Sequence, residues 1–182
     1  MYEAREDKDL AFMLQYENIA WYEDGQVRIL DRRVYPAKTH FVVCNSHVEV
    51  MQAIRDMVTQ SAGPYTAAPM GMALAAWECR NMGIKQQTAY LEEASNCISN
   101  ARPTTRKRMA QLTRSCVEVA TKAIAEGSRA DLAIRDFTVR ANNMRYSKIA
   151  AAAKYLVDMF PKNGTVMTQC FAETIVGMML RE

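Results

Sequence analysis

Two long stretches of helical hydrophobic periodicity, covering residues 103–159, constrain this 182-residue chain more than any other feature. In the first, apolar residues recur every three or four positions and form one stripe, made of Met109, Leu112, Cys116, Val119, Ala123 and Ile124. Glu126-Gly127-Ser128 breaks the pattern, and a second, very long helix is predicted over 128–159, with Asn142-Asn143 as a possible bend. Because long amphipathic helices bury their stripes against one another, we expect a helical bundle.

The front of the chain has a different pattern, which is typical of short strands. Asp24-Gly25 separates two β-rich runs, and this dipeptide is a hairpin signal. A third strand is expected at Phe41–Cys44, so residues 15–45 are predicted to form a small antiparallel sheet. Ser46 stands as an N-cap, with Glu49 at the capping-box distance, and begins the first helix after the sheet.

Two further segments complete the expected fold. Residues 67–82 are apolar nearly all round, which predicts a buried helix that ends at Gly83. Residues 165–170 are β-rich and 172–180 have helical periodicity, and a strand followed by a helix begins a βα unit. Since no second strand follows to pair with the first, we expect a fragment of a longer protein, or a partner chain that completes the sheet.

The predicted fold class is therefore an α+β N-terminal domain, a small antiparallel sheet plus a helical bundle, followed by the first βα unit of a Rossmann-like α/β domain. The first domain is expected over 1–160, with the sheet over 15–45 and the helices over 46–160. The truncated Rossmann-like domain is expected over 161–182.

Composition limits the function classes. Apolar residues make up 49% and charged residues 24%, as in soluble globular proteins, and a net charge of +3 is too small to indicate nucleic acid by itself. No apolar run is long enough for a membrane span, and no signal-peptide pattern begins the chain. Five cysteines without a C-x-x-C pair suggest neither a disulfide framework nor a zinc site, and reduced thiols in a cytoplasm are the simplest interpretation.

Three local features could carry chemistry. Cys170 ends the expected strand, where open α/β sheets face their ligand crevice, so it is either an acid/base or nucleophilic group or a small buried hydrophobe. Arg102 precedes a helix start at Pro103, which makes either a phosphate or carboxylate seat or an ordinary helix start with solvated arginines. Residues 60–65 form either a backbone nest for an anion or a plain helix connector.

Three separated stretches resemble one family, the methylthioribose-1-phosphate isomerases. The run from Ile19 to Gly25, with Ile29–Arg33 and Tyr35-Pro36, resembles the start of these proteins. Ala101-Arg102-Pro103-Thr104 resembles their A-R-P-T stretch, and Thr168-Gln169-Cys170 resembles their T-H-C-N strand end. The family also includes ribose-1,5-bisphosphate isomerases and the α, β and δ subunits of initiation factor 2B. The resemblance covers nearly the whole chain but only about half of a family member.

The resemblance implies an aldose–ketose isomerase that acts on a ribose 1-phosphate derivative in methionine salvage, without metal or organic cofactor, as a cytoplasmic homodimer. It implies that Cys170 and a later aspartate form an acid/base pair, and that Arg102 holds the phosphate. Gln60, Ser61 and Ala62 match the beginning of the family's R-G-A-P-A-I-G stretch and are expected to bind substrate. Arg106 and Arg108 are left as surface charges.

The chain also departs from the family pattern. Gln60 stands where the family has an arginine, and Phe171 stands where it has an asparagine. Gln169 replaces a histidine, and Lys107 replaces an asparagine in a way that restores some positive charge. Because the partner aspartate would lie beyond Glu182, we expect no isomerase activity from the chain as given. The alternative is a non-catalytic regulatory or scaffold subunit similar to those of initiation factor 2B.

Overall fold

A computed structural model describes residues 5–182, and the first four residues of the expected first domain lie outside this range. One antiparallel sheet has the strand order β1 (Ala20–Glu23), β2 (Gln26–Leu30) and β3 (Phe41–Cys44). The helices are η1 (Phe12–Leu14), α1 (Tyr16–Ile19), α2 (His47–Arg55), α3 (Pro64–Glu78), α4 (Ile84–Ser99), η2 (Pro103–Thr105), α5 (Arg106–Ala125), α6 (Ala130–Asp158) and α7 (Glu173–Arg181). The small antiparallel sheet with many helices is as predicted.

The hairpin between β1 and β2 forms at the predicted dipeptide. Asp24 and Gly25 both have positive φ, 46° and 80°, as the two-residue turn of a tight hairpin requires. Side chains alternate along β2, so that Val27 and Ile29 are buried while Arg28 faces outward. One face of the sheet therefore contributes to the core.

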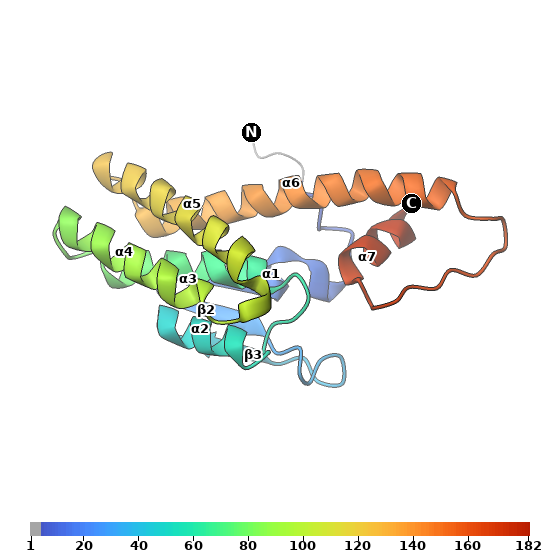
Figure 1. The fold of residues 1–182 in the computed structure, drawn as a ribbon, viewed down its shortest axis with the longest axis horizontal. Helices are drawn as coiled ribbons and strands as arrows, with labels where there is room; N and C mark the ends of the chain where they lie inside the picture. The colour runs from blue at the N-terminus through green and yellow to red at the C-terminus, as the bar shows by residue number, and fades with distance from the viewer. Residues whose placement is uncertain (1–4) are drawn as a thin grey trace.

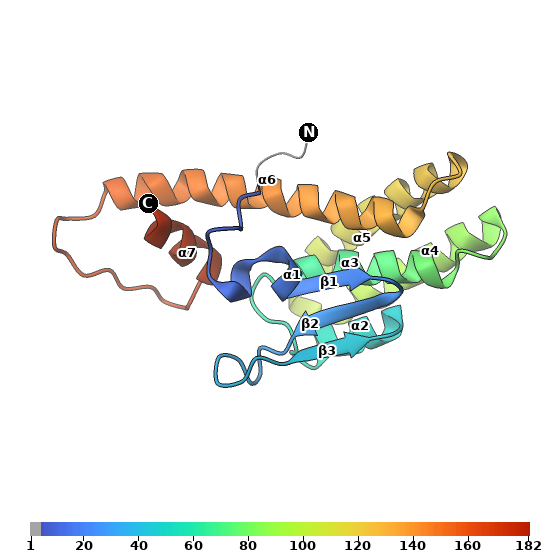
Figure 2. The ribbon, with the colours of Figure 1, turned by 180° about the vertical axis from the view of Figure 1, so that it is seen from behind.

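Helix α3 lies at the centre of the molecule and contacts α2, α4, α5, α6 and the sheet (Figures 1 and 2). Twelve of its fifteen residues are buried, which confirms the predicted all-round apolar helix. A Cβ added to Gly71 would meet Val50 at 2.8 Å and Ile98 at 3.1 Å, so the missing side chain lets α2 and α4 approach closely. The glycine is a packing residue.

The predicted end of this helix is wrong. Helix α3 ends at Glu78, and Gly83 is the N-cap of α4, where its N–H donates to Gln86 Oε1 at 3.2 Å. Gly83 has a φ of −63°, so it does not use the left-handed conformation that ends a helix. A glycine between two helices can end the first helix or cap the start of the second, and the local sequence does not distinguish these two roles.

Other predicted helix boundaries are confirmed. Ser46 Oγ accepts the N–H of Glu49 at 3.2 Å, while the Glu49 carboxylate accepts from Asn45 N–H at 2.8 Å. Gly127, with a φ of 67°, follows the end of α5 at the predicted break. Helix α6 continues through Asn142-Asn143 without interruption, because both side chains bond to neighbouring elements.

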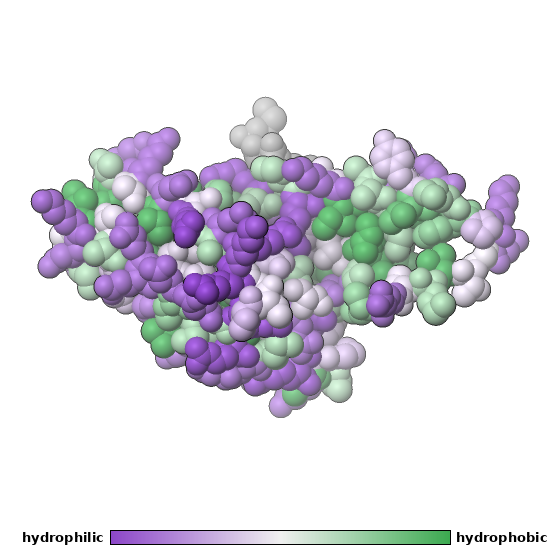
Figure 3. Space-filling view, viewed as in Figure 1, coloured by the Kyte–Doolittle hydropathy of each residue, from purple (hydrophilic) through white to green (hydrophobic). Residues whose placement is uncertain are grey.

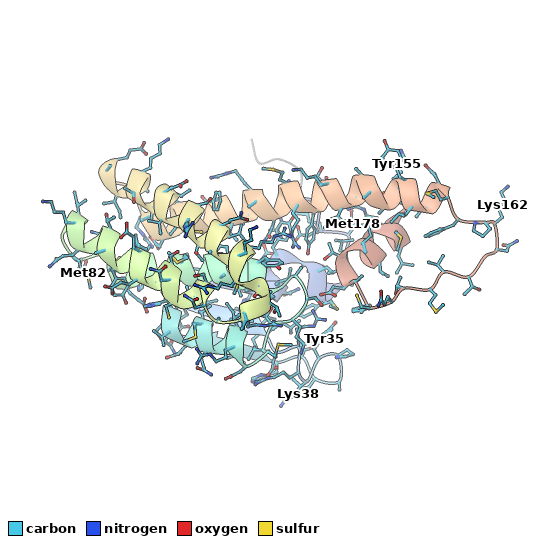
Figure 4. All side chains as sticks on the ribbon, viewed as in Figure 1. Tyr35, Lys38, Met82, Tyr155, Lys162 and Met178 are labelled. Atoms are coloured by element: carbon cyan, nitrogen blue, oxygen red, sulfur yellow. The ribbon has the colours of Figure 1, made fainter. Side chains whose placement is uncertain are left out.

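The C-terminal helix α7 folds back onto α6 and η1. Met178 is fully buried in a second apolar cluster with Tyr16, Leu30 and Tyr146, and it points from α7 toward α6 (Figure 4). Glu173 at the start of α7 pairs with Arg32 at 3.3 Å. Figures 1 and 2 show α7 beside the far half of α6. The helix predicted over 172–180 is therefore confirmed, apart from its first residue.

The strand expected over 165–170 does not form. Residues 164–172 are irregular and follow a turn in which Gly164 N–H donates to Pro161 O at 3.0 Å. They form part of the long connection between α6 and α7 that Figure 1 shows at the edge of the molecule. Within residues 5–182, the sheet consists of β1, β2 and β3, and no strand pairs with this segment. The assignment of 161–182 to a Rossmann-like domain stays a prediction.

Within residues 5–182, no helix combines the length and the apolar character that crossing a bilayer needs.

Candidate functional site

The loop of residues 60–63 joins α2 to α3 and contains three of the predicted substrate-binding residues. Gln60 is partly buried and donates weakly to Met57 O at 3.4 Å. Ser61 is exposed in the left-handed region, with a φ of 52°, and Ala62 is partly buried. A Cβ on Gly63 would lie 2.0 Å from Thr59 Oγ1, so with Thr59 in this position the absence of a side chain allows the tight entry into α3.

Arg102 is placed at the beginning of η2, as predicted. It is the N-cap residue of this short turn, with extended backbone, and its side chain is partly buried. The turn leads directly into α5 at Arg106. Arg102 therefore stands at a helix start with free N–H groups nearby, although it lines neither of the two cavities described below.

Cys170 lies in the irregular segment and is exposed to solvent. The expectation that it ends a strand is wrong, because no strand forms there, but it does lie three residues before α7. Cys44, Cys79 and Cys116 are buried, and burial raises the pKa of each thiol. Exposure therefore separates Cys170 from these three cysteines, and its acid/base or nucleophilic role stays a prediction.

Two cavities adjoin the loop of residues 60–63, and Ala62 lines both of them. The smaller one has a volume of about 20 Å³, room for about one water molecule, and lies between the loop, β2, α6 and α7. The larger one has a volume of about 410 Å³ and lies between α3, α5 and α6. Its lining consists of Ala62, Tyr65, Arg108, Ala141, Met144, Arg145, Lys148 and Ile149. A cavity of this size can hold a small metabolite.

The larger cavity is positively charged. Arg108 lies over the ring of Tyr65, with its Cζ atom 4.5 Å from the ring centroid. Arg145 lies 4.9 Å from the Tyr146 centroid, and its Nε atom is buried without a hydrogen-bond partner among residues 5–182. Burial lowers the pKa of Arg145, and the like charge of Arg108 lowers it further. The guanidinium is thus held where its charge is poorly compensated.

Sequence reasoning missed this charged group of residues. It assigned Arg108 to the surface, where the structure has it exposed, but it did not single out Arg145 or Lys148. The available signal was that Arg145 and Lys148 are three residues apart on one helix and therefore share a face. Their approach to Arg108 depends on the packing of α5 against α6, which no local pattern reveals.

Two other polar clusters are structural. Glu78 accepts from His47 N–H at 3.0 Å and from Tyr90 OH at 3.2 Å, which ties α2, α3 and α4 together. Asp131 accepts from Tyr22 OH at 2.8 Å and pairs with Arg129. No group of three or more potential ligands among residues 5–182 is arranged to hold a metal ion.

Sequence comparison identifies relatives over most of the chain, although no family model matches it. Methylthioribose-1-phosphate isomerase from Roseiflexus castenholzii is 31% identical over 159 residues, which cover 84% of this chain and 44% of that protein. The protein of the same name from Thermosipho africanus is 27% identical over 163 residues, 87% of this chain and 45% of the relative. The chain therefore spans less than half the length of the curated relatives it matches.

Solved structures share the fold. 5-Methylthioribose 1-phosphate isomerase from Pyrococcus horikoshii superimposes with a TM-score of 0.56 at 21% identity, over 79% of this chain and 41% of that one. The δ subunit of translation initiation factor eIF-2B from A. fulgidus gives the same TM-score at 19% identity, over 79% and 42%. At these identities the likeness concerns the fold alone. It confirms the small three-stranded sheet with many helices.

Proposed function

Because this chain is homologous to the methylthioribose-1-phosphate isomerases over 84% of its length, we propose that it binds a ribose 1-phosphate derivative as part of an aldose–ketose isomerase. Methylthioribose 1-phosphate is the first candidate substrate, since it appears in the name of the relatives. The observation that carries the proposal is the 31% identity over 159 residues, together with the match of Ala101-Arg102-Pro103-Thr104 to the family stretch.

The chemistry explains which residues are needed. A phosphate on C1 blocks simple opening of the sugar ring, so an acid has to protonate the ring oxygen as its bond to C1 breaks. The hydrogen on C2 then moves to C1, and the C2 hydroxyl loses its proton to a base and becomes the ketone, while the phosphate stays on C1. We assign the acid/base role to Cys170 and phosphate binding to Arg102, and we assign substrate binding to Gln60, Ser61 and Ala62 as well. Because Cys170 is exposed here, further protein has to cover it before the site is dry.

We therefore propose that the 182-residue chain binds the sugar phosphate without converting it. The experiment adds methylthioribose 1-phosphate to the purified chain and follows the ketose product by ¹H NMR, while thermal unfolding with and without ligand reports binding. We expect a higher Tm with the ligand and no ketose. Turnover by the chain alone would contradict the proposed inactivity.

A non-catalytic role is the second candidate. Gln60 replaces an arginine of the family pattern, and losing such a charge-assisted contact weakens phosphate binding by roughly 1.5–3 kcal/mol. Phe171 replaces the asparagine that follows the cysteine, and the δ subunit of eIF-2B matches the fold as well as the isomerase does. If no sugar phosphate raises the Tm, a scaffold or regulatory subunit becomes the better interpretation.

The substitution Gln60→Arg tests the departure directly. It restores the arginine of the family pattern in the loop before α3, so we expect the Tm increase produced by methylthioribose 1-phosphate to become larger. Gln111→Arg is the matched control, because it adds the same charge at an exposed position on α5. An equal gain in both variants would mean that only the overall charge matters.

The resemblance also leads us to propose a cytoplasmic homodimer. Size-exclusion chromatography with light scattering measures the mass of the particle in solution, and a particle with the mass of one chain would contradict the proposed dimer.

A further inference from the structure

Positive charge is concentrated in the larger cavity without any acidic neighbour in its wall. Three of the eight lining residues are cationic, Arg108 from α5 and Arg145 and Lys148 from α6, and none is acidic. The other lining residues are apolar or aromatic. Arg145 is partly buried, whereas Arg108 and Lys148 are exposed, so the charge of Arg145 is the one that water screens least and that an anion would offset most.

Within residues 5–182, no ion pair supplies the opposite charge, although Glu173, which pairs with Arg32, lines the smaller cavity together with Arg145. Within residues 5–182, none of the three cations has a carboxylate within 4.0 Å, whereas Arg5, Arg32, Arg33, Arg129, Arg135 and Arg181 each do. Burial lowers the pKa of Arg145, and the like charge of Arg108 lowers it further. The cavity cations therefore differ from the ordinary paired arginines of this protein.

Two of the cations are also held in place. Arg108 stacks on the Tyr65 ring, and Arg145 is partly buried next to the Tyr146 ring, with its Nε atom unpaired. Both residues lie on helices that contact each other and α3, so their spacing does not depend on a loop. Arginines that are positioned before binding lose less conformational freedom when they bind an anion.

We propose that this cavity binds a small phosphate monoester, with its phosphate near Arg108, Arg145 and Lys148 and its body against Tyr65, Met144 and Ile149. Arginine side chains recognise phosphate through paired N–H donors, and the apolar wall suits the uncharged part of such a ligand. The cavity's volume of about 410 Å³ accommodates a small molecule. The three cations lie outside the residues assigned to isomerisation, so this site would remain if the proposed isomerase function failed.

Titration of inorganic phosphate into the 182-residue chain, at constant ionic strength, tests the charged part of the site by calorimetry. We expect saturable binding that weakens about tenfold in Arg108→Gln, in Lys148→Gln and in Arg145→Met, as for the loss of one charge-assisted contact. Lys107→Gln on α5 and Lys154→Gln on α6 are the matched controls, since both are exposed and line neither cavity. We expect the controls to change the affinity less than twofold.

The phosphate titrations distinguish a defined site from a surface of diffuse positive charge. Absence of phosphate binding, or equal weakening by the control substitutions, would overturn the proposed site and leave a surface of diffuse positive charge. Because Arg145 is partly buried, the Tm of Arg145→Met without phosphate is measured as a folding control, and the exposed Lys148 provides the test if that variant does not fold.

A second titration, with ribose 5-phosphate, tests whether the site prefers an esterified phosphate to free phosphate. It also tests this site independently of the isomerase proposal. Ribose 5-phosphate should bind more tightly than inorganic phosphate and should lose affinity in the same three variants. Equal affinity for the two ligands would overturn the assignment to a monoester. Loss of ribose 5-phosphate affinity in Lys148→Gln, without any Tm response of the unsubstituted chain to methylthioribose 1-phosphate, would leave this site standing while the isomerase proposal fails.

Discussion

Two regions of the molecule, the surroundings of α3 and the segment after α6, have similar apolar side chains in opposite environments. Around α3, side chains such as Ile54, Leu74 and Leu91 are fully buried. In the segment after α6, Met167 is 94% exposed and Phe171 is 61% exposed, and Figure 3 shows the apolar colours gathered where α6, α7 and their connection lie. In Figure 4, Tyr155 and Lys162 project from this part of the chain. Burial therefore depends on packing partners, and the two regions differ mainly in how many they have.

Hydrogen exchange should show the largest difference between the regions. Amides of α3 are hydrogen-bonded within a buried helix, whereas residues 164–172 belong to no helix or strand. We expect the α3 amides to exchange at least about a thousandfold more slowly than those of 165–170. Mass spectrometry of deuterated peptides measures this. Comparable protection of 165–170 would mean that this segment pairs as a strand in solution, as the sequence predicted.

Truncation of one apolar side chain in each region sharpens the comparison. Leu74→Ala removes a fully buried side chain from α3, and we expect the free energy of unfolding to fall by about 2–5 kcal/mol. Met167→Ala is the control in the exposed segment, where the change should stay within about 0.5 kcal/mol. Urea unfolding measures both. A large loss in Met167→Ala would show that the exposed segment is packed in solution.

Rates of thiol labelling compare the exposed segment after α6 with the buried core, because each region contains at least one cysteine. At pH 8, Cys170 should react with a thiol reagent at least about a hundredfold faster than Cys116 or Cys44, because the latter two are buried. Burial raises the pKa of Cys44 to about 11, so little thiolate is present at that pH. The fast phase should disappear in Cys170→Ser. Its persistence in that variant would contradict the assigned exposure.

Acid should destabilise the packed region through Asp131. Burial alone would raise the pKa of this carboxyl, but hydrogen bonds from Arg129 and Tyr22 outweigh it and the net pKa is lowered. Its stabilisation is therefore present above the ordinary aspartate pKa of about 3.9 and is lost as the pH falls through the lower folded value. We expect Asp131→Asn to cost about 1–3 kcal/mol at pH 7 and to flatten the loss of stability below pH 4.

The matched control for this prediction is Asp158→Asn, at the exposed end of α6. Unfolding by urea at pH 7 and at pH 3 gives the free energies for both variants. If Asp158→Asn flattened the pH dependence as much as Asp131→Asn does, the effect would come from total charge and the network with Tyr22 would not explain it.

The features that the sequence predicted correctly are local ones. The Asp24-Gly25 turn and the Ser46 cap each depend on a few adjacent residues, and the structure confirms both. A strand at 165–170 requires a distant partner, so its β-rich composition was not sufficient. The cationic cavity was missed for the same reason, since Arg108 and Arg145 meet only after α5 packs against α6.

Calorimetric titration of methylthioribose 1-phosphate, compared with methylthioribose itself, tests the proposed function most directly. Because the phosphate is the group that the cationic side chains recognise, we expect saturable binding of the phosphorylated sugar by the 182-residue chain and no detectable binding of the unphosphorylated one. Equal binding of both sugars, or binding of neither, would contradict the proposal that this chain carries the phosphate-binding part of a sugar-phosphate isomerase.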